Sequence, residues 1–359
     1  MSKKIKLAII TDPLKTYGGL ERLLLGILEL YPESFVYTPF YKKESLPKEF
    51  SLYTIVESKY ASLLKKIGPL AVLLYPLSFE SFSFLDDFDI CFSITSGFAK
   101  DINTKNKPHI SYIMTPPRFL WNLPNSNQDR FRFKKILLFI NNTLRLKDFY
   151  SSQLPQRLLS ISVTVQKRIK KFYRRDSFVL YPFVDTELFN INSKYKDGDY
   201  FIIISRLEKY KNIETVIDIC NKLKLKLIIV GRGSYQKYLE SIANRKYIKF
   251  LGYIKDRDMI DMINASRALI FPTAEDFGLV PVEALACGKS VIAYNKDGAS
   301  EVIVDKSNGY LYNTKHELEN ILINFDSSLF DRYKLRESSM RFSKEVFRKE
   351  LNKILESYE

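Results

Sequence analysis

The sequence predicts an α/β protein made of two doubly wound domains. Its 359 residues exceed the size at which one hydrophobic core keeps growing. Short apolar runs alternate with helical stretches in both halves, as in parallel sheets flanked by helices. A polar segment at residues 181–200 interrupts this alternation and is the predicted linker. We therefore expect domains at residues 1–185 and 199–339, with a C-terminal helix at about 340–359 that packs back on the first.

The composition predicts a globular protein with an anionic partner. Hydrophobic residues make up 46% of the chain and charged residues 27%, which is ordinary for a soluble domain. The three cysteines lie far apart in apolar contexts, so reduced core thiols are expected. The net charge of +15 is compatible with nucleic acid, an anionic membrane surface or a phosphorylated substrate.

The first half begins with a predicted strand rather than a targeting segment. Lysines precede only five apolar residues before Thr-Asp-Pro, too few for a signal peptide. No stretch has the roughly 18 uncharged apolar residues of a spanning helix. We therefore expect a cytoplasmic protein. The strands predicted in this half are residues 4–11, 35–40, 52–56, 88–94, 109–114, 157–162 and 177–182.

Three segments of the first half combine Lys or Arg with bulky apolar residues. Two are predicted helices, residues 59–77 and 131–149, and the third is the basic cluster at 166–175. Basic and apolar residues together are typical of helices that rest on anionic lipid. A core-packed helix whose lysines extend into solvent is the alternative for each segment. Three such segments in one half favour membrane contact, so we expect the protein to associate peripherally with the inner face of the cell membrane.

The second half alternates more regularly and predicts a nearly all-parallel sheet. Its expected strands are residues 200–205, 225–231, 248–252, 268–273 and 290–295. Its expected helices are residues 212–223, 235–245, 256–266 and 281–287, followed by a charged helical segment from about 330. We find no solenoid-length repeat.

The loop after strand 268–273 is the strongest candidate for a ligand site. Glu275 lies at the carboxyl end of that strand, where open α/β sheets bind ligands. Pro281 is predicted at the first helical position, Glu283 in the first turn, and Gly288 at the helix end. The free helix amides suit a phosphate between two carboxylates that hold hydroxyls, which is the layout of a nucleotide diphosphate sugar. The alternative is a dipole-complementing Glu283 and a solvated Glu275.

Two other loops carry candidate phosphate ligands. Arg206 and Lys211 follow the first strand of the second domain, and Arg and Lys are the side chains that hold phosphate oxygens. Gly18 and Gly19 lie between the chain's first strand and helix, where backbone can approach a ligand. A flexible turn explains the two glycines equally well.

The ordered motifs resemble a known family. The chain contains SRLEKYKN, VGRGS, FLGYI, EDFGLVPVEALACG and DGASEVI, in the order and near the spacing of the retaining family 4 glycosyltransferases. The resemblance extends through YGGLER, ISYIMTPPRFLWN and YPFVDTELF to the branch of GDP-mannose-dependent mannosyltransferases of surface polysaccharide assembly. It covers nearly the whole chain. It implies the GT-B fold, in which two Rossmann-like domains face each other across a cleft.

The resemblance also implies donor-site roles. Glu275, Arg206 and Lys211 would act in catalysis, with Glu275 on the sugar hydroxyls and the two cations on the diphosphate. Glu283 would hold the ribose. The other implied donor-binding residues are Gly18 and Gly19 in the first domain, Phe277, Gly278 and Leu279 through their amides, and Arg232, Tyr253 and Ile254 beside the nucleobase.

On the acceptor side, Met114 occupies a position where the resembling branch usually has His. A thioether cannot titrate, so either the leaving phosphate serves as the base or the protein is a weak or inactive nucleotide-sugar-binding subunit. Arg118 and Trp121 are expected to contact the acceptor, although Trp121 is equally suited to cover the core. The acceptor is expected to be a lipid-linked molecule or a glycan.

The implied reaction is retaining transfer of a sugar, with mannose from GDP-mannose as the expected donor. Front-face attack needs no carboxylate nucleophile, so positioning and electrostatic stabilisation would dominate. No metal and no other cofactor is expected. A nucleic-acid partner is not expected, because the chain contains no RNA- or DNA-binding motif. A dinucleotide-dependent dehydrogenase is not expected either, because the chain lacks GxGxxG after its first strand.

Overall fold

The protein divides into two compact units in the computed structural model. The first comprises Met1–Tyr181 with Arg348–Glu359, and the second comprises Pro182–Phe347. The structure describes residues 5–84, 87–121, 123, 134–196 and 198–358, and of residues 69 and 134–140 only the backbone. The start of the predicted 131–149 helix therefore lies outside the described residues. Cys91, Cys220 and Cys287 are free and buried, as predicted.

The first unit is built on a seven-stranded parallel sheet in the order β3-β2-β1-β4-β5-β6-β7. The predicted strands are present, each shifted or trimmed by a few residues. Their bounds are β1 Leu7–Thr11, β2 Phe35–Thr38, β3 Ile55–Glu57, β4 Ile90–Thr95, β5 His109–Ile113, β6 Arg157–Ser160 and β7 Phe178–Val179. The residues of β1, β4 and β5 are buried throughout, which explains their continuous apolar character.

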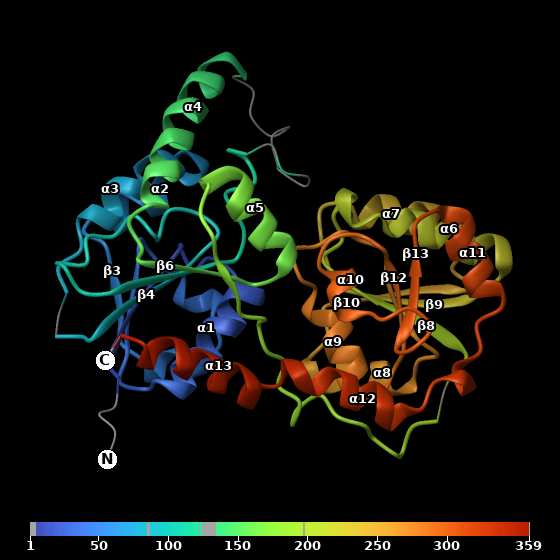
Figure 1. Cartoon of the computed structure of the whole chain (residues 1–359). Coiled ribbons are helices and arrows are strands. Elements are labelled where there is room, and N and C mark those ends of the chain that lie inside the picture. Colours follow the sequence, from blue (N-terminus) through green and yellow to red (C-terminus); the bar gives the residue numbers. More distant parts are fainter. Residues whose placement is uncertain (1–4, 85–86, 122, 124–133, 197, 359) are drawn as a thin grey trace. The chain divides into compact units, whose positions relative to one another are not determined.

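Helices cover both faces of this sheet (Figure 1). Their bounds are α1 Gly19–Leu30, α2 Ala61–Lys66, α3 Tyr75–Glu80, α4 Lys134–Ser151 and α5 Val163–Tyr173, joined by the end of α13 Lys344–Glu356. The short 3₁₀ turns η1 and η2 span Lys43–Ser45 and Lys48–Leu52. Phe79 of α3 and Leu144 of α4 pack with Ala8, Tyr37 and Cys91 in one core cluster.

The prediction of one continuous helix at 59–77 is wrong. The segment forms α2, then the 3₁₀ turn η3 Gly68–Leu74, then α3. Gly68 has φ +58°, a left-handed conformation that ends α2, and a proline follows it. The apolar and basic residues of this segment are therefore displayed by three short pieces.

The second unit contains a six-stranded parallel sheet in the order β10-β9-β8-β11-β12-β13. Its strands are β8 Tyr200–Ile204, β9 Lys226–Val230, β10 Ile248–Gly252, β11 Leu269–Phe271, β12 Val291–Tyr294 and β13 Gly309–Tyr312. The sequence did not predict β13, which adds to the edge beside β12. Figure 1 shows α6 Ile213–Leu223, α7 Gln236–Ile242 and α11 Lys315–Ile323 on one face, with α8 Asp256–Ala265, α9 Leu279–Ala286 and α12 Arg332–Ser339 on the other.

Both sheets reverse their strand order at one point. In the first unit the reversal lies between β1 and β4, and in the second between β8 and β11. Loops that leave such neighbouring strands diverge to opposite faces and open a crevice at the carboxyl edge, which is where doubly wound sheets bind ligands. These two edges therefore locate the candidate sites.

Candidate functional site

The carboxyl edge of the second sheet collects most of the predicted donor-binding residues. Arg206 and Lys211 follow β8, Arg232 follows β9, Tyr253 and Ile254 follow β10, and the loop of Glu275 follows β11. Because the strands are parallel neighbours, all these loops lie at one edge. The sequence thus predicted their common location correctly within this unit.

Lys211 and Glu275 form an ion pair at the topological switch point of the second sheet, which is the reversal of strand order between β8 and β11. Only 7% of the Lys211 side chain is exposed, compared with 31% for Glu275. Lys211 lies in η5 Lys209–Lys211, which starts the connection to α6. A buried ammonium needs a counter-charge, and Glu275 supplies it. The backbone carbonyl of Glu275 also accepts a 2.8 Å hydrogen bond from the amide of Gly298.

Helix α9 begins two residues earlier than predicted, at Leu279 instead of Pro281. Gly278 precedes it with φ +91°, a conformation open to glycine. Pro281 is tolerated at the third helical position because the first four amides of a helix have no intrahelical acceptor. The helix ends as predicted at Gly288, whose amide bonds to the Leu285 carbonyl at 2.8 Å.

Glu283 consequently lies in the second turn of α9, and not in the first. Its exposed fraction is 2%. Phe277 is buried too, edge-on to the ring of Phe342 at 5.4 Å. Leu279 is half-buried at the start of the helix. The ribose role of Glu283 and the amide roles of the loop stay predictions.

Two glycines that the sequence analysis did not single out hold these loops together. A Cβ on Gly233 would lie 2.2 Å from the Leu207 carbonyl oxygen, and one on Gly298 would lie 2.2 Å from the Phe277 Cα. Both are backbone contacts, so no side chain can be accommodated there. The loops after β8 and β9, and those after β11 and β12, therefore pack backbone to backbone. The GRG and DGA triplets are the sequence signals that mark them.

The arginine and tyrosine side chains that these loops carry at the carboxyl edge are exposed. Arg206 and Arg232 are both exposed, and Tyr253 is 70% exposed with Ile254 half-buried beside it. Arg206 donates to the Tyr210 hydroxyl at 3.3 Å. This edge can therefore offer positive charge and a ring face to a ligand from solvent.

At the corresponding edge of the first unit, Gly18 and Gly19 begin α1. Both are exposed. The Gly18 amide donates to the Glu21 carboxylate at 2.9 Å, which closes the start of the helix. The glycine loop is therefore an ordered helix start.

Asp12 is a residue that the sequence analysis missed, although it directly follows the first strand. Its carboxylate accepts from the Thr95 hydroxyl at 3.0 Å and from the Ser96 amide at 2.6 Å, which bridges β1 and β4. Burial raises the pKa of Asp12, and these hydrogen bonds oppose that shift. The switch point of the first sheet thus also carries a carboxylate.

The predicted acceptor-side residues follow β5. Met114 is half-buried, and its amide donates to the Thr95 carbonyl at 2.8 Å. Arg118 is half-buried in the turn beyond it. Trp121 packs against the core cluster, stacks on Phe172 at 4.9 Å and donates its indole N–H to Asp148 at 2.7 Å. Trp121 therefore anchors its loop to the core.

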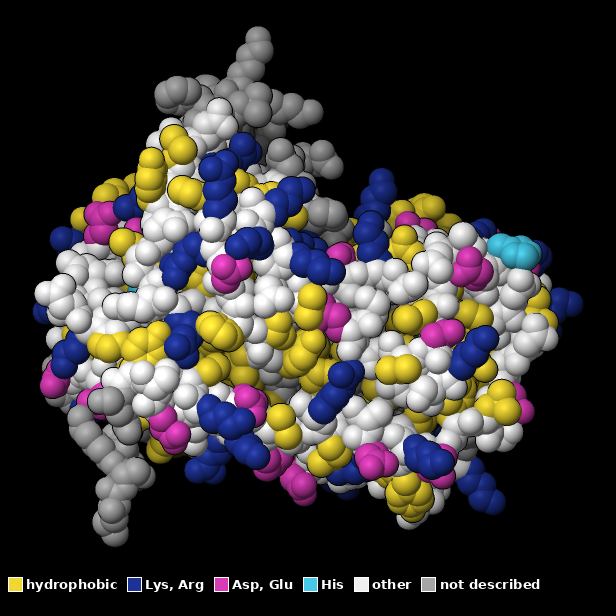
Figure 2. All heavy atoms as spheres, in the orientation of Figure 1, with side chains coloured by type: hydrophobic (Ala, Val, Ile, Leu, Met, Phe, Trp, Pro, Cys, Tyr) yellow, Lys and Arg dark blue, Asp and Glu magenta, His cyan; other side chains and the backbone are white. Residues whose placement is uncertain are grey.

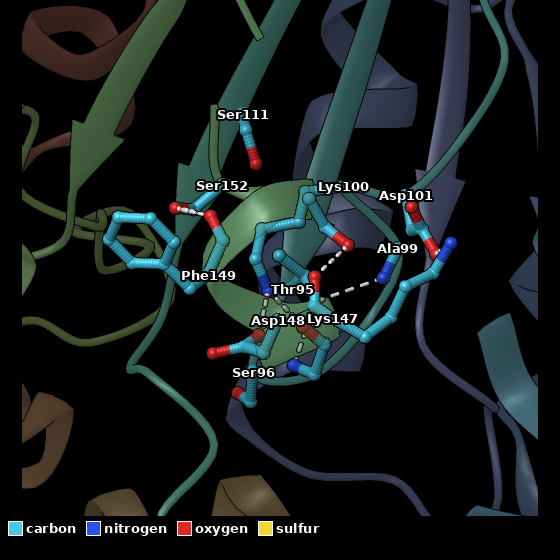
Figure 3. Close-up of polar contacts among 12 residues, drawn as sticks. Thr95, Ser96, Ala99, Lys100, Asp101, Ser111, Lys147, Asp148, Phe149 and Ser152 are labelled. Carbon is cyan, nitrogen blue, oxygen red and sulfur yellow. Dashed lines mark hydrogen bonds and ion pairs between the residues drawn. The ribbon is translucent and has the colours of Figure 1, made fainter. Parts of the chain in front are cut away.

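Trp121 belongs to a buried polar network, whose Lys100 and Asp148 side chains are shown in Figure 3. Lys100 and Asp148, 1% and 0% exposed, form an ion pair of 2.5 Å. Lys100 also donates to the Gly97 carbonyl at 2.5 Å. The second Asp148 oxygen accepts from Trp121, so both carboxylate oxygens are used. The network joins the loop after β4, helix α4 and Trp121, and no sequence pattern indicated it.

Two features are absent from the residues that the structure describes, a membrane-spanning helix and a metal-binding group. None of the helices in the described part is long and apolar enough to cross a membrane. Nor do three or more His, Cys, Asp or Glu residues gather into a metal-binding group among the residues that the structure covers.

Comparison with known proteins locates a family match in the second unit. Residues 184–346 match the family model "Glycosyl transferases group 1". Uncharacterized glycosyltransferase MJ1178 of Methanocaldococcus jannaschii is 24% identical over 58% of this chain and 60% of its own length. Serotype-specific mannosyltransferase WbdA of Escherichia coli is 27% identical over 43% of this chain and 20% of its own. The chain spans about half the length of the first curated relatives it matches.

Solved structures match the whole fold. Anabaena Alr3699/HepE in complex with UDP and glucose has a TM-score of 0.74 at 19% identity, covering 98% of this chain and 100% of that chain. Sucrose-phosphate synthase from Thermosynechococcus elongatus has a TM-score of 0.76 at 13% identity, covering 98% of both chains. The second unit is thus similar to the group 1 glycosyl transferases over nearly all of its length, and the two α/β units have the GT-B fold.

Proposed function

We propose that the protein is a retaining glycosyltransferase that uses a nucleotide diphosphate sugar. The observation that carries this proposal is the Lys211–Glu275 pair, which lies at the switch point of the sheet that matches the family model. The pair puts an ammonium suited to phosphate oxygens beside a carboxylate suited to sugar hydroxyls. The exposed Arg206 follows the same strand as Lys211.

We propose mannose from GDP-mannose as the donor. The names of WbdA and of alpha-1,3/1,6-mannosyltransferase ALG2 of Dictyostelium discoideum support a mannosyl group. The HepE structures contain UDP, UDP with glucose, and UDP-glucose, which supports a nucleotide diphosphate donor in general. Arg232, Tyr253 and Ile254 would border the base, and Glu283 the ribose.

The reaction would proceed by front-face attack. Glu275, with Lys211 as its counter-charge, would orient the sugar hydroxyls and would not need to act as a nucleophile. Arg206 and Lys211 would stabilise the negative charge that develops on the leaving diphosphate. The leaving phosphate oxygen would take the proton of the acceptor hydroxyl, so the titratable His absent at Met114 is not required.

The acceptor would be a lipid-linked molecule or a glycan at the cytoplasmic face of an anionic membrane. Leu63, Leu70 and Leu77 are 46%, 59% and 52% exposed, and Lys65 and Lys66 lie exposed among them. Exposed leucines beside lysines match the composition of segments that insert shallowly at anionic lipid. They support peripheral membrane contact through η3 and its flanking helices.

A second candidate is a nucleotide-sugar-binding subunit with little or no turnover. Met114 motivates it, since a thioether stands where the resembling branch has His. Both candidates predict donor binding, and only the first predicts transfer or donor hydrolysis.

A panel of nucleotide sugars tests the proposal by thermal shift and by release of free nucleotide. GDP-mannose should raise the melting temperature most, because a ligand that binds only the folded state stabilises it by mass action. A larger shift with UDP-glucose would replace the donor and keep the reaction class. Binding without any nucleotide release would favour the second candidate, and no shift with any sugar nucleotide would contradict both.

A further inference from the structure

The first unit carries a concentration of positive charge around α4 and α5. Residues 143–175 contain nine Lys and Arg residues and one acid, Asp148. Asp148 is fully buried and binds Lys100 and Trp121, so it does not offset the surface cations. Several of the nine already have partners, since Lys147 pairs with Glu80 and Asp101, Lys170 pairs with Asp176, and Arg175 donates to backbone carbonyls. A cluster of cations remains on α5 and beside it.

Arg168 places this charge at the carboxyl edge of the first sheet. Its guanidinium lies 3.5 Å from the Thr115 hydroxyl, just beyond the end of β5. Helix α5 itself begins at this edge directly after β6, and the Ser162 hydroxyl caps it by accepting from the Val165 amide at 3.1 Å. The positive end of the helix dipole therefore adds to the Arg168 charge. This is the edge where a doubly wound sheet binds a ligand.

Two more cations, Lys171 and Arg145, lie beside the stacked rings of Phe172 and Trp121. Lys171 is exposed one helical turn further along. Its neighbour Phe172 stacks on Trp121. Arg145 donates through Nε to the Leu120 carbonyl at 2.8 Å, and its guanidinium lies 5.6 Å from the Trp121 ring centre. Figure 2 shows Lys and Arg side chains gathered over the α5 region of this unit.

We propose that Arg168 and Lys171, flanked by Arg145, form a subsite for a phosphate group of the acceptor. This inference rests on the proposed glycosyltransferase function and names the acceptor class. Arg supplies a planar fork and Lys a point charge, which together suit the oxygens of a phosphate ester. Trp121 is held by Phe172 and Asp148, so it fixes the position of the aromatic pair beside which Lys171 and Arg145 lie. An acceptor with a phosphate or diphosphate near its reactive hydroxyl is preferred over a neutral glycan.

The test compares two double variants of the full chain by titration calorimetry with farnesyl diphosphate. The test variant is Arg168→Gln/Lys171→Gln, and the matched control is Lys43→Gln/Lys48→Gln, which removes two exposed charges elsewhere on the first unit. The nucleoside diphosphate of whichever nucleotide sugar gives the largest thermal shift is present at saturation, which keeps the proposed donor site filled. The test variant should bind about tenfold or more weakly, since two charge-assisted contacts are lost, and the control within about twofold of the native protein.

Two further arms identify the source of the phosphate. If the test variant also binds inorganic pyrophosphate more weakly by the same factor, the subsite recognises the phosphate alone. If its affinity falls only for farnesyl diphosphate, the subsite recognises a lipid-linked phosphate. Either result supports the subsite. Unchanged affinity of the test variant for both anions would overturn the proposal, as would equal losses in test and control. Weaker binding only to phosphatidylglycerol vesicles would assign the charge to membrane contact and also overturn it. If no nucleotide sugar binds while the anion result holds, the proposed function fails, and Arg168 and Lys171 remain a phosphate-binding site without an acceptor role.

Discussion

Replacing Lys100 by Met should strongly destabilise the first unit, because Asp148 would stay buried without its cation. The two side chains are 1% and 0% exposed and 2.5 Å apart, and the Trp121 indole would be left as the donor to Asp148. Removing one partner of a buried pair costs about 3–5 kcal/mol. For a unit of this size, about 2–4 °C per kcal/mol converts that cost into a melting temperature lower by roughly 6–20 °C.

Thermal unfolding followed by circular dichroism at pH 7 measures this effect. Lys353→Met is the matched control, because the Lys353–Glu350 pair has a similar length, 2.7 Å, but side chains that are 58% and 48% exposed. That change should cost no more than about 0.5 kcal/mol. The variant Lys100→Met/Asp148→Leu should regain part of the loss, since it leaves no unpaired buried charge. If Lys100→Met is as stable as the Lys353→Met control, the buried pair does not have the role described.

The other predictions concern the donor site, the Met114 position and pH. Glu283→Ala should weaken binding of the nucleotide with or without its sugar, whereas Glu275→Ala should spare the bare nucleotide and impair the intact donor; calorimetry in which both variants bind bare nucleotide equally poorly would refute this division. Arg206→Ala should lower kcat by about 100-fold and affect KM less, and an unchanged kcat at saturating donor would count against a transition-state role. Met114→His should preserve or raise turnover, and a large loss would mean that this loop is misaligned with the resembling family. Burial lowers the pKa of His109 to about 3, below its usual 6.5. The free energy of unfolding therefore has its full value above pH 6.5 and decreases as the pH falls, because the unfolded chain then takes up a proton at this residue. Free energies of urea unfolding at pH 7 and pH 4 should differ by about 3 kcal/mol because of His109, and the His109→Gln variant should lack this difference.

The fold was largely predictable because buried parallel strands have continuous apolar runs. The exceptions have local causes. Strand β13 consists of four residues, Gly309–Tyr312, with two half-buried, so it lacks such a run. The break at Gly68 follows from a left-handed backbone conformation, and the apolar spacing on either side of it resembled one helix.

The sequence predicted the sheet edge at which the candidate site residues lie, but not which of these residues contact one another. Glu275 and Lys211 each follow a strand, which fixes their edge, but their ion pair depends on β8 and β11 being neighbours. The same holds for Asp12, whose bond to Ser96 crosses from β1 to β4. Lys100 and Asp148 gave no signal at all, since a lone Lys and a lone Asp in a sequence are expected on the surface.

The backbone contacts at Gly233 and Gly298 have a consequence for engineering. Those two glycines admit no side chain, so the loops at this edge of the second sheet depend on glycine there for their close packing, while Arg232 and Tyr253 in the same loops are exposed. Under the proposed function, a library confined to those two exposed positions would test new nucleotide preferences with little loss of folded protein. In a library that also varied the two glycines, most members would carry a side chain that clashes with neighbouring backbone and would fold poorly.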